Sequence, residues 1–583
     1  MRTLRRLFSN PNPKRSADVA DLRSWGEWVW PRALRRAIES SDPADIDQTG
    51  NDLSVLGAGV VGHIDAGGTI ALSDRPASIE VWVGGGDRWW FPAIEGSVRQ
   101  RRVDGLPIVE TRMRVGDADV VMTAWADEPG DGRGRIVVSC ATETEVPVVL
   151  AVVVRPFTRT GPGSIEEMRS VDNLLVANGR PIVVLPREPG DVLVGSSENG
   201  DCARQLGDRL VGDTHVAAAD GSATLAAMLP LTPGADLQFE IVDGREEATV
   251  SPAPLDAVVA GWKSHLELAA NVELPGWPKH LLPSLLSGMI GSGHDQGVAA
   301  RTHIAAALIA MGLDRPAATL LESVLDDVAL GSVDRSDWPS IALAVGRHFA
   351  LGSELTPALE AHGDTVGYVT GEALRSCGPL QRTELAAAIR ALGNPRAAED
   401  VESASLSPSA SGARTSARLG VDIEDDAWAH VDSDLDATSV ASITTAMVST
   451  SRTGRAVDGL VALRALAGST WRWGIGDDPT ERARIALAMR SLVVRETSTG
   501  IDVVPGISTA WFGQNVTVER VPTRHGLISF ALRWHGPRPA LLWEVEASSA
   551  SPVELTCRSL DPSWQTMEAS GEALLEAPNT GSH

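Results

Sequence analysis

The sequence predicts a multidomain α and β protein whose strands and helices occupy separate stretches of the chain. Across residues 46–250, and again across 499–575, apolar and polar residues alternate, as in strands with one buried face. Across residues 255–498, apolar residues recur every three or four positions, which is typical of amphipathic helices. We therefore expect an N-terminal antiparallel β-sandwich, a central layer of α-hairpins and a small C-terminal β domain.

The first 45 residues are predicted to be a tail followed by one docking helix. Asp21–Ser40 has helical spacing, and it places Trp25 and Trp28 on one face beside Leu22. Such a face is expected to pack against the neighbouring domain.

The β-sandwich is predicted from short alternating segments with no helical pattern between them. Glycine- and proline-rich turns such as Gly84–Asp87 and Pro129–Gly132 separate the segments, which favours antiparallel strands joined directly. The clearest predicted strands are Ser78–Val83, Val109–Val115, Ile136–Thr142, Val148–Val154, Pro181–Leu185 and Leu237–Val242.

The central segment is predicted to contain short helices in antiparallel pairs. Gly312 and Gly393 lie just after two of them, where a glycine commonly ends a helix. The serine- and alanine-rich stretch 403–416 is predicted to be a mobile loop inside this domain. The expected helices are 255–270, 279–290, 296–312, 315–330, 338–351, 354–362, 369–377, 381–392, 395–403, 437–449, 455–467 and 480–495.

After residue 499 the period-two pattern returns, so a second β domain is expected to end the chain. Pro537-Arg-Pro539 is expected to form a hairpin turn between two of its strands. The predicted strands are Ile501–Val504, Asn515–Glu519, Leu527–Trp534, Ala540–Val545 and Val553–Cys557.

Composition narrows the classes of partner. A formal net charge of −25 argues against nucleic acid or an anionic membrane as the main ligand. We find no signal-peptide pattern and no apolar run long enough for an integral membrane segment. The four cysteines are widely separated, as in proteins of a reducing compartment, so a cytoplasmic location is expected. The sequence does not indicate an oligomeric state.

Known cofactor and metal motifs give little support for either kind of site. Gly57-Ala-Gly-Val-Val-Gly62 matches the dinucleotide fingerprint, but the residues that follow it return to strand alternation, so we interpret it as a β turn. The sequence contains no Cys-x-x-Cys pair and no helical histidine pair of the metalloprotease type. We therefore expect no cofactor and no metal.

Tryptophan is the most informative residue type, because an indole face stacks against the apolar C–H face of a sugar. Several of the 17 tryptophans lie near predicted loops or helix starts, next to acidic residues. We single out as candidate substrate-binding residues Trp338, Trp471, Trp473, Asp87, Trp89 and Trp90.

The order of these parts resembles the six-hairpin, (α/α)6-toroid glycosidase superfamily, which includes glucoamylase-like and rhamnosidase-like enzymes. The string Trp511–Gly526, followed by Ser529–Trp534, is similar to the β domain that follows such toroids. The resemblance covers about residues 50–565 and is architectural. It implies a central α-hairpin toroid, an oligosaccharide or glycoconjugate as substrate, and two carboxylates acting at the toroid mouth.

Four acidic residues are candidates for the two catalytic carboxylates. Asp337 opens a helix beside Trp338, Asp477 and Asp478 follow Trp471 and Trp473, and Glu372 is a reserve near Tyr368. For Asp337 and Asp478, helix N-capping is the structural alternative, since each precedes a helix start that contains proline.

Two functions therefore stay open. One is a glycoside hydrolase, and the other is a non-catalytic toroid relative that acts as a glycan-binding or assembly scaffold.

Overall fold

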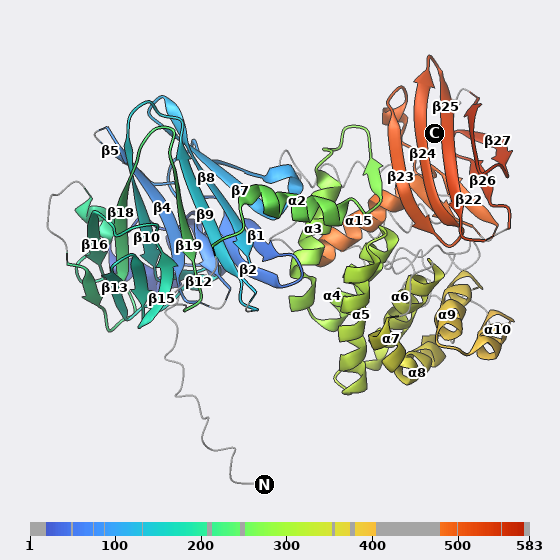
Figure 1. The fold of residues 1–583 in the computed structure, drawn as a ribbon, viewed down its shortest axis with the longest axis horizontal. Coiled ribbons are helices and arrows are strands. Elements are labelled where there is room, and N and C mark those ends of the chain that lie inside the picture. Colours follow the sequence, from blue (N-terminus) through green and yellow to red (C-terminus); the bar gives the residue numbers. More distant parts are fainter. Residues whose placement is uncertain are drawn as a thin grey trace, which may run out of the picture. The chain divides into compact units, whose positions relative to one another are not determined.

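The computed structural model describes residues 19–47, 50–73, 75–86, 88–130, 132–206, 213–244, 251–351, 356–373, 379–403, 479–497, 499–549 and 551–576. These residues fall into two compact units that divide between Val258 and Val259. The first unit consists mainly of strands, with short helices near the N-terminus, and the second combines most of the central helices with the C-terminal strands (Figure 1). The predicted fold class is confirmed. The expected loop 403–416 and the expected helices 437–449 and 455–467 lie almost wholly outside the described residues.

The first unit contains two large antiparallel sheets. One has the strand order β1-β2-β3-β4-β10-β18-β16, with β5 paired to β4. The other has the order β17-β13-β14-β15-β19-β9-β8-β7-β6. The strands of the first sheet are β1 (Gly50–Val55), β2 (Gly59–Asp65), β3 (Ile70–Leu72), β4 (Ser78–Gly85), β5 (Arg88–Trp90), β10 (Val148–Arg155), β16 (Asp191–Gly195) and β18 (Thr224–Leu231). Those of the second are β6 (Arg99–Arg102), β7 (Ile108–Val115), β8 (Ala118–Asp127), β9 (Arg135–Thr142), β13 (Glu167–Val171), β14 (Leu174–Ala177), β15 (Arg180–Val184), β17 (His215–Ala217) and β19 (Asp236–Ile241).

Alternation along the strands gives each sheet an inner and an outer face. On β4, Ile79 and Val81 join the core between the sheets, whereas Trp82 belongs to a second cluster on the outer face. On β10, Val152 lies in the core and Ala151 lies with Trp82. The outer face of the first sheet is therefore apolar as well, and other segments of the chain must pack on it to exclude water.

The N-terminal segment forms two helices, not the single helix expected over Asp21–Ser40. A 3₁₀ helix spans Val19–Trp25, and α1 begins only at Arg32 and ends at Ser40. Gly26 has a φ of +85°, a left-handed conformation that an α-helix cannot include, and Pro31 immediately precedes α1. These two residues explain the break.

The tryptophans of this segment pack against a residue of the sandwich. Leu22, Trp25 and Trp28 are buried in one cluster with Phe157 of the sandwich. The rings of Trp25 and Trp28 are 5.0 Å apart, and each lies 6.2 Å from the Phe157 ring. The segment therefore buries its tryptophans against the first unit.

Most of the described helices after residue 254 follow the predicted ranges closely, but α8 spans Gly363–Ala373 and so begins six residues before the predicted helix 369–377. Gly312 and Gly393 have positive φ values just after α4 and α9, as expected for helix ends. Helix α15 packs against α3 and α4, and α6 packs against α8 and α9. The helices are α2 (Leu255–Leu266), α3 (Leu281–Ser292), α4 (Val298–Ala310), α5 (Asp314–Ala329), α6 (Trp338–Ala350), α7 (Pro357–Ala361), α8 (Gly363–Ala373), α9 (Pro379–Ala391), α10 (Pro395–Ser403) and α15 (Pro479–Val493).

The C-terminal strands form two sheets within the second unit. One has the order β20-β23-β24-β25-β28 and the other β21-β22-β26-β27. Strand β20 precedes the helices in sequence, yet it pairs with β23, so the helical segment starts and ends at the same β domain. The strands are β20 (Asn271–Glu273), β21 (Val494–Glu496), β22 (Gly500–Val503), β23 (Val516–Thr523), β24 (Gly526–His535), β25 (Arg538–Ala547), β26 (Glu554–Cys557), β27 (Asp561–Thr566) and β28 (Ser570–Leu574).

A search of the described helices for a membrane-spanning segment finds none that is both long and apolar enough.

Candidate functional site

Asp337 is the catalytic candidate whose side chain the structure describes. It ends the 3₁₀ helix Arg335–Asp337 and directly precedes α6. It occupies the N-cap position of α6, as the structural alternative expected, but its side chain makes no capping hydrogen bond. Asp334 caps the preceding 3₁₀ helix, because its carboxylate accepts a hydrogen bond of 2.8 Å from the Ser336 backbone N–H. That hydrogen bond lowers the pKa of Asp334.

Trp338 is buried between two neighbours. The centroid of its ring lies 4.8 Å from that of Tyr368 on α8. The Arg335 guanidinium lies over the Trp338 ring, 5.4 Å from its centroid, in a cation–π contact. Its indole N–H is buried without a hydrogen-bond acceptor among the described residues. Tyr368 is 56% exposed, so the exposed aromatic surface at this place belongs to Tyr368 and not to Trp338.

Glu372 is brought to the same place by the geometry of α8. It follows Tyr368 by four positions in this helix, and the structure describes its backbone but not its side chain. Helix α8 packs against α6, which Asp337 directly precedes, and the Trp338 and Tyr368 rings meet where the two helices pack. Two of the four candidate acidic residues are thus on adjoining elements. Asp477, Asp478, Trp471 and Trp473 lie outside the described residues.

The tryptophans of the first unit point to opposite faces of its first sheet. Trp90 on β5 is buried in the core between the sheets, and the Arg88 guanidinium lies 4.6 Å from its ring. Trp89 is half-buried and packs on the outer face, where it lines a pocket of about 670 Å³. Asp87, the third candidate on this hairpin, lies outside the described residues.

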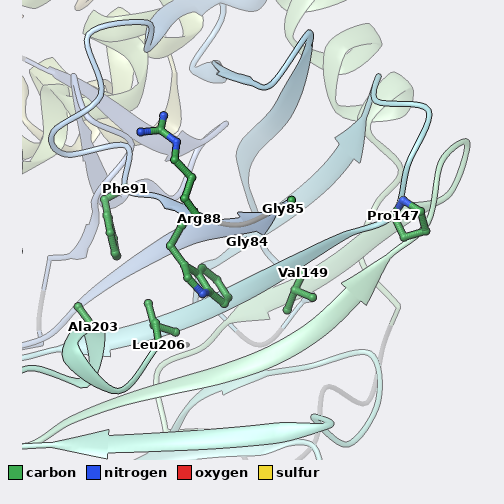
Figure 2. A pocket seen from close by; sticks show the side chains of 10 residues that line it. Gly84, Gly85, Arg88, Phe91, Pro147, Val149, Ala203 and Leu206 are labelled. Atoms are coloured by element: carbon green, nitrogen blue, oxygen red, sulfur yellow. The ribbon is translucent and has the colours of Figure 1, made fainter. Parts of the chain in front are cut away.

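The sequence did not single out the other residues of this pocket. They include Phe91 after β5, Val149 on β10, and Ala203 and Leu206 in and after the 3₁₀ helix Cys202–Gln205 (Figure 2). The signal that was available is the run Gly84–Gly86 next to Trp89, since consecutive glycines leave room beside an aromatic ring.

The glycine fingerprint forms a turn, as expected. Gly57 and Gly59 have φ values of +82° and +88° in the tight connection between β1 and β2. His63 on β2 contacts Asp52 on β1, with 3.2 Å between Nδ1 and Oδ1. Within the part of the chain that the structure describes, no three His, Cys, Asp or Glu side chains gather as a metal site.

Comparison with known proteins gives structural likenesses alone. No family model matches the chain, and no curated protein matches it. A proposed kojibiose phosphorylase from the human microbiome is 6% identical, with a TM-score of 0.45, and covers 91% of each chain. A family GH92 α-mannosidase from Bacteroides thetaiotaomicron is 8% identical, with a TM-score of 0.30, over 73% of this chain and 72% of that one. Its complex with mannoimidazole gives a TM-score of 0.31 at 8% identity over 73% of each chain. The names of these proteins are those of carbohydrate-active enzymes. Sequence identities of 6–8% and TM-scores below 0.5 do not assign this chain to a family.

Proposed function

We propose that the protein is a carbohydrate-active enzyme that hydrolyses glycosidic bonds with two carboxylates, Asp337 and Glu372. The observation that carries the proposal is the contact between Trp338 and Tyr368, with 4.8 Å between ring centroids. This contact joins the start of α6 to α8, the helix that contains Glu372. Glycoside hydrolysis uses two carboxyl groups, and an aromatic ring beside them offers an apolar face to the sugar.

Each part of this arrangement has a role in glycoside hydrolysis. One carboxyl group protonates the leaving oxygen, and the other acts as a base on water or as a nucleophile at the anomeric carbon. The Asp337 side chain is available for such a role because it makes no capping hydrogen bond to α6. The exposed ring of Tyr368 offers a face for stacking a pyranose. Asp477 and Asp478 stay candidate carboxylates on the evidence of the sequence.

The similar structures agree with this class of substrate by their names alone, since they are described as a kojibiose phosphorylase and an α-mannosidase. The alternative function is a scaffold that binds glycans without turnover. The aromatic pocket on the first unit favours that alternative, because its ring face can hold a sugar without any carboxylate.

The proposed function is tested by replacing the two carboxylates with their amides. Asp337→Asn and Glu372→Gln should each lower the hydrolysis of a cleaved aryl glycoside or glucan by at least about 10²-fold, because general acid–base catalysis contributes about that factor. Initial rates on the full-length chain measure the effect, and circular dichroism verifies the fold.

Asp334→Asn is the matched control, since it changes an exposed aspartate three positions earlier whose role is capping. Its rate should stay close to that of the wild type. Full activity in both Asp337→Asn and Glu372→Gln would exclude these two residues as the catalytic pair.

A further inference from the structure

The pocket on the outer face of the first sheet is built around the hairpin of β4 and β5. In the register of the strands, Gly84 pairs with Trp89 on one side and with Val149 on the other. These three residues therefore lie in one row across β5, β4 and β10, on the same face of the sheet. Because Gly84 has no side chain, the row has a hollow in its middle.

Gly84 also fixes the position of the Trp89 ring. A Cβ atom added at Gly84 would lie 2.8–2.9 Å from three ring atoms of Trp89, closer than real Cβ atoms come. The indole thus rests directly over the backbone of Gly84, and one of its faces is turned away from the sheet. Any larger residue at position 84 would push the ring out of this position.

Apolar walls surround this ring. In Figure 2, Phe91, Ala203 and Leu206 gather at one end of the pocket, while Val149 and Pro147 extend towards the other. The Phe91 ring packs edge-on against the buried Trp82, with 5.0 Å between centroids, which holds that wall in place. The volume of about 670 Å³ is within the range of small-molecule sites, which is roughly 300–1,000 Å³.

The charges around the pocket disfavour an anionic ligand. Among the described lining residues, the charged one is Arg88, and its guanidinium is directed to the other face, over Trp90 and 3.2 Å from a Glu95 carboxylate oxygen. The chain as a whole carries a net charge of −25, which repels anionic ligands. Gly84 and Gly85 belong to the paired strand β4, so their peptide groups lie in the plane of the sheet, and the other described lining side chains are apolar or aromatic.

We propose that this pocket is a binding site for a neutral oligosaccharide, in which the Trp89 indole stacks on the apolar face of a hexose. Phe91 and Leu206 limit the pocket at one end. The site holds a sugar and performs no reaction. It goes beyond the proposed hydrolase activity, because it uses residues of the first unit alone and stands whether or not Asp337 is catalytic.

The test is calorimetric titration of the full-length chain with a panel of neutral α-glucans, mannans and arabinans. Wild type should bind at least one of them, and Trp89→Ala should weaken that binding by about tenfold or more, which corresponds to about 1.4 kcal/mol, because it removes the ring face on which the sugar stacks. Gly84→Ala should weaken binding in the same direction by displacing the ring. Trp89→Phe, which restores a smaller ring face, should recover part of the affinity.

Trp564→Ala is the matched control, because it removes a half-buried tryptophan on β27 of the second unit. Its affinity should equal that of the wild type. The proposal is overturned if wild type binds no neutral glycan, or if Trp89→Ala and Gly84→Ala bind as the wild type does. Asp337→Asn separates the two proposals, since it should lose hydrolysis and keep this binding.

Discussion

Glu496→Gln should destabilise the second unit by about 3–5 kcal/mol, the cost of removing one partner from a buried ion pair. Glu496 is fully buried at the end of β21. Its Oε1 accepts hydrogen bonds from Arg347 at 2.6 Å and from Arg490 at 2.7 Å, and its Oε2 accepts from Arg524 at 3.1 Å. One carboxylate thus joins α6, α15 and the turn after β23. A neutral amide in place of this carboxylate would remove the negative charge that the buried guanidinium groups of Arg347 and Arg490 contact.

Urea unfolding followed by tryptophan fluorescence measures this loss, with Glu519→Gln as the control. Glu519 is exposed on β23 and accepts a hydrogen bond of 3.0 Å from Asn271, so its amide variant should change stability by less than about 0.5 kcal/mol. Equal stability of the two variants would show that Glu496 does not connect the helices to the β domain energetically.

The same carboxylate makes the second unit sensitive to acid. Burial alone would raise the pKa of Glu496, but the charges of Arg347, Arg524 and Arg490 outweigh burial and hold its pKa well below the ordinary value of 4.5. The folded state therefore binds this proton less readily than the unfolded state does. Its contribution to stability is complete above about pH 4.5 and is lost as the pH falls towards the folded pKa.

Arg155→Met should destabilise the first unit by a similar amount, about 3–5 kcal/mol. Arg155 is completely buried, 3.7 Å from a Glu80 oxygen and 3.6 Å from an Asp201 oxygen. Its guanidinium also lies 4.8 Å from the ring of Phe157, which holds the N-terminal segment. Methionine would keep the volume but leave two buried acidic groups without their cation.

A double variant separates the charge effect from packing. Glu80→Gln combined with Arg155→Met should recover part of the lost stability, because burial already raises the pKa of Glu80 and its charged form is the costly one. Arg204→Met is the control, since Arg204 pairs with the exposed Glu27 and such pairs contribute about 0–1 kcal/mol. If the double variant were as unstable as the sum of its parts, uncompensated charge would not be the cause.

Local patterns in the sequence were enough to predict the fold class, because strand and helix periods depend on neighbours in the chain. Gly312 and Gly393 end helices where expected, for the same local reason. The N-terminal helix was predicted too long, because the prediction followed the apolar spacing across Gly26 and Pro31. The positive φ of Gly26 and the proline before α1 interrupt the helix in spite of that spacing.

The candidate sites could be predicted only in part, because each depends on contacts between distant segments. Tyr368 and Trp338 were both noticed, but their contact needs α6 and α8 to pack, which no local pattern shows. The role of Gly84 appears only when β4 is paired with β5 and β10. Trp89 and Trp90 looked equivalent in the sequence, and strand alternation placed them on opposite faces.

The most direct measurement of carbohydrate activity is a screen of the wild-type, full-length chain. Hydrolysis of aryl glycosides and of natural α-glucans, mannans and arabinans would be followed by the release of reducing sugar, and binding to the same panel by calorimetry. The account predicts turnover of at least one substrate, lost in Asp337→Asn and kept in Asp334→Asn. Binding without turnover would support the scaffold alternative, and the absence of both turnover and binding would contradict a carbohydrate function.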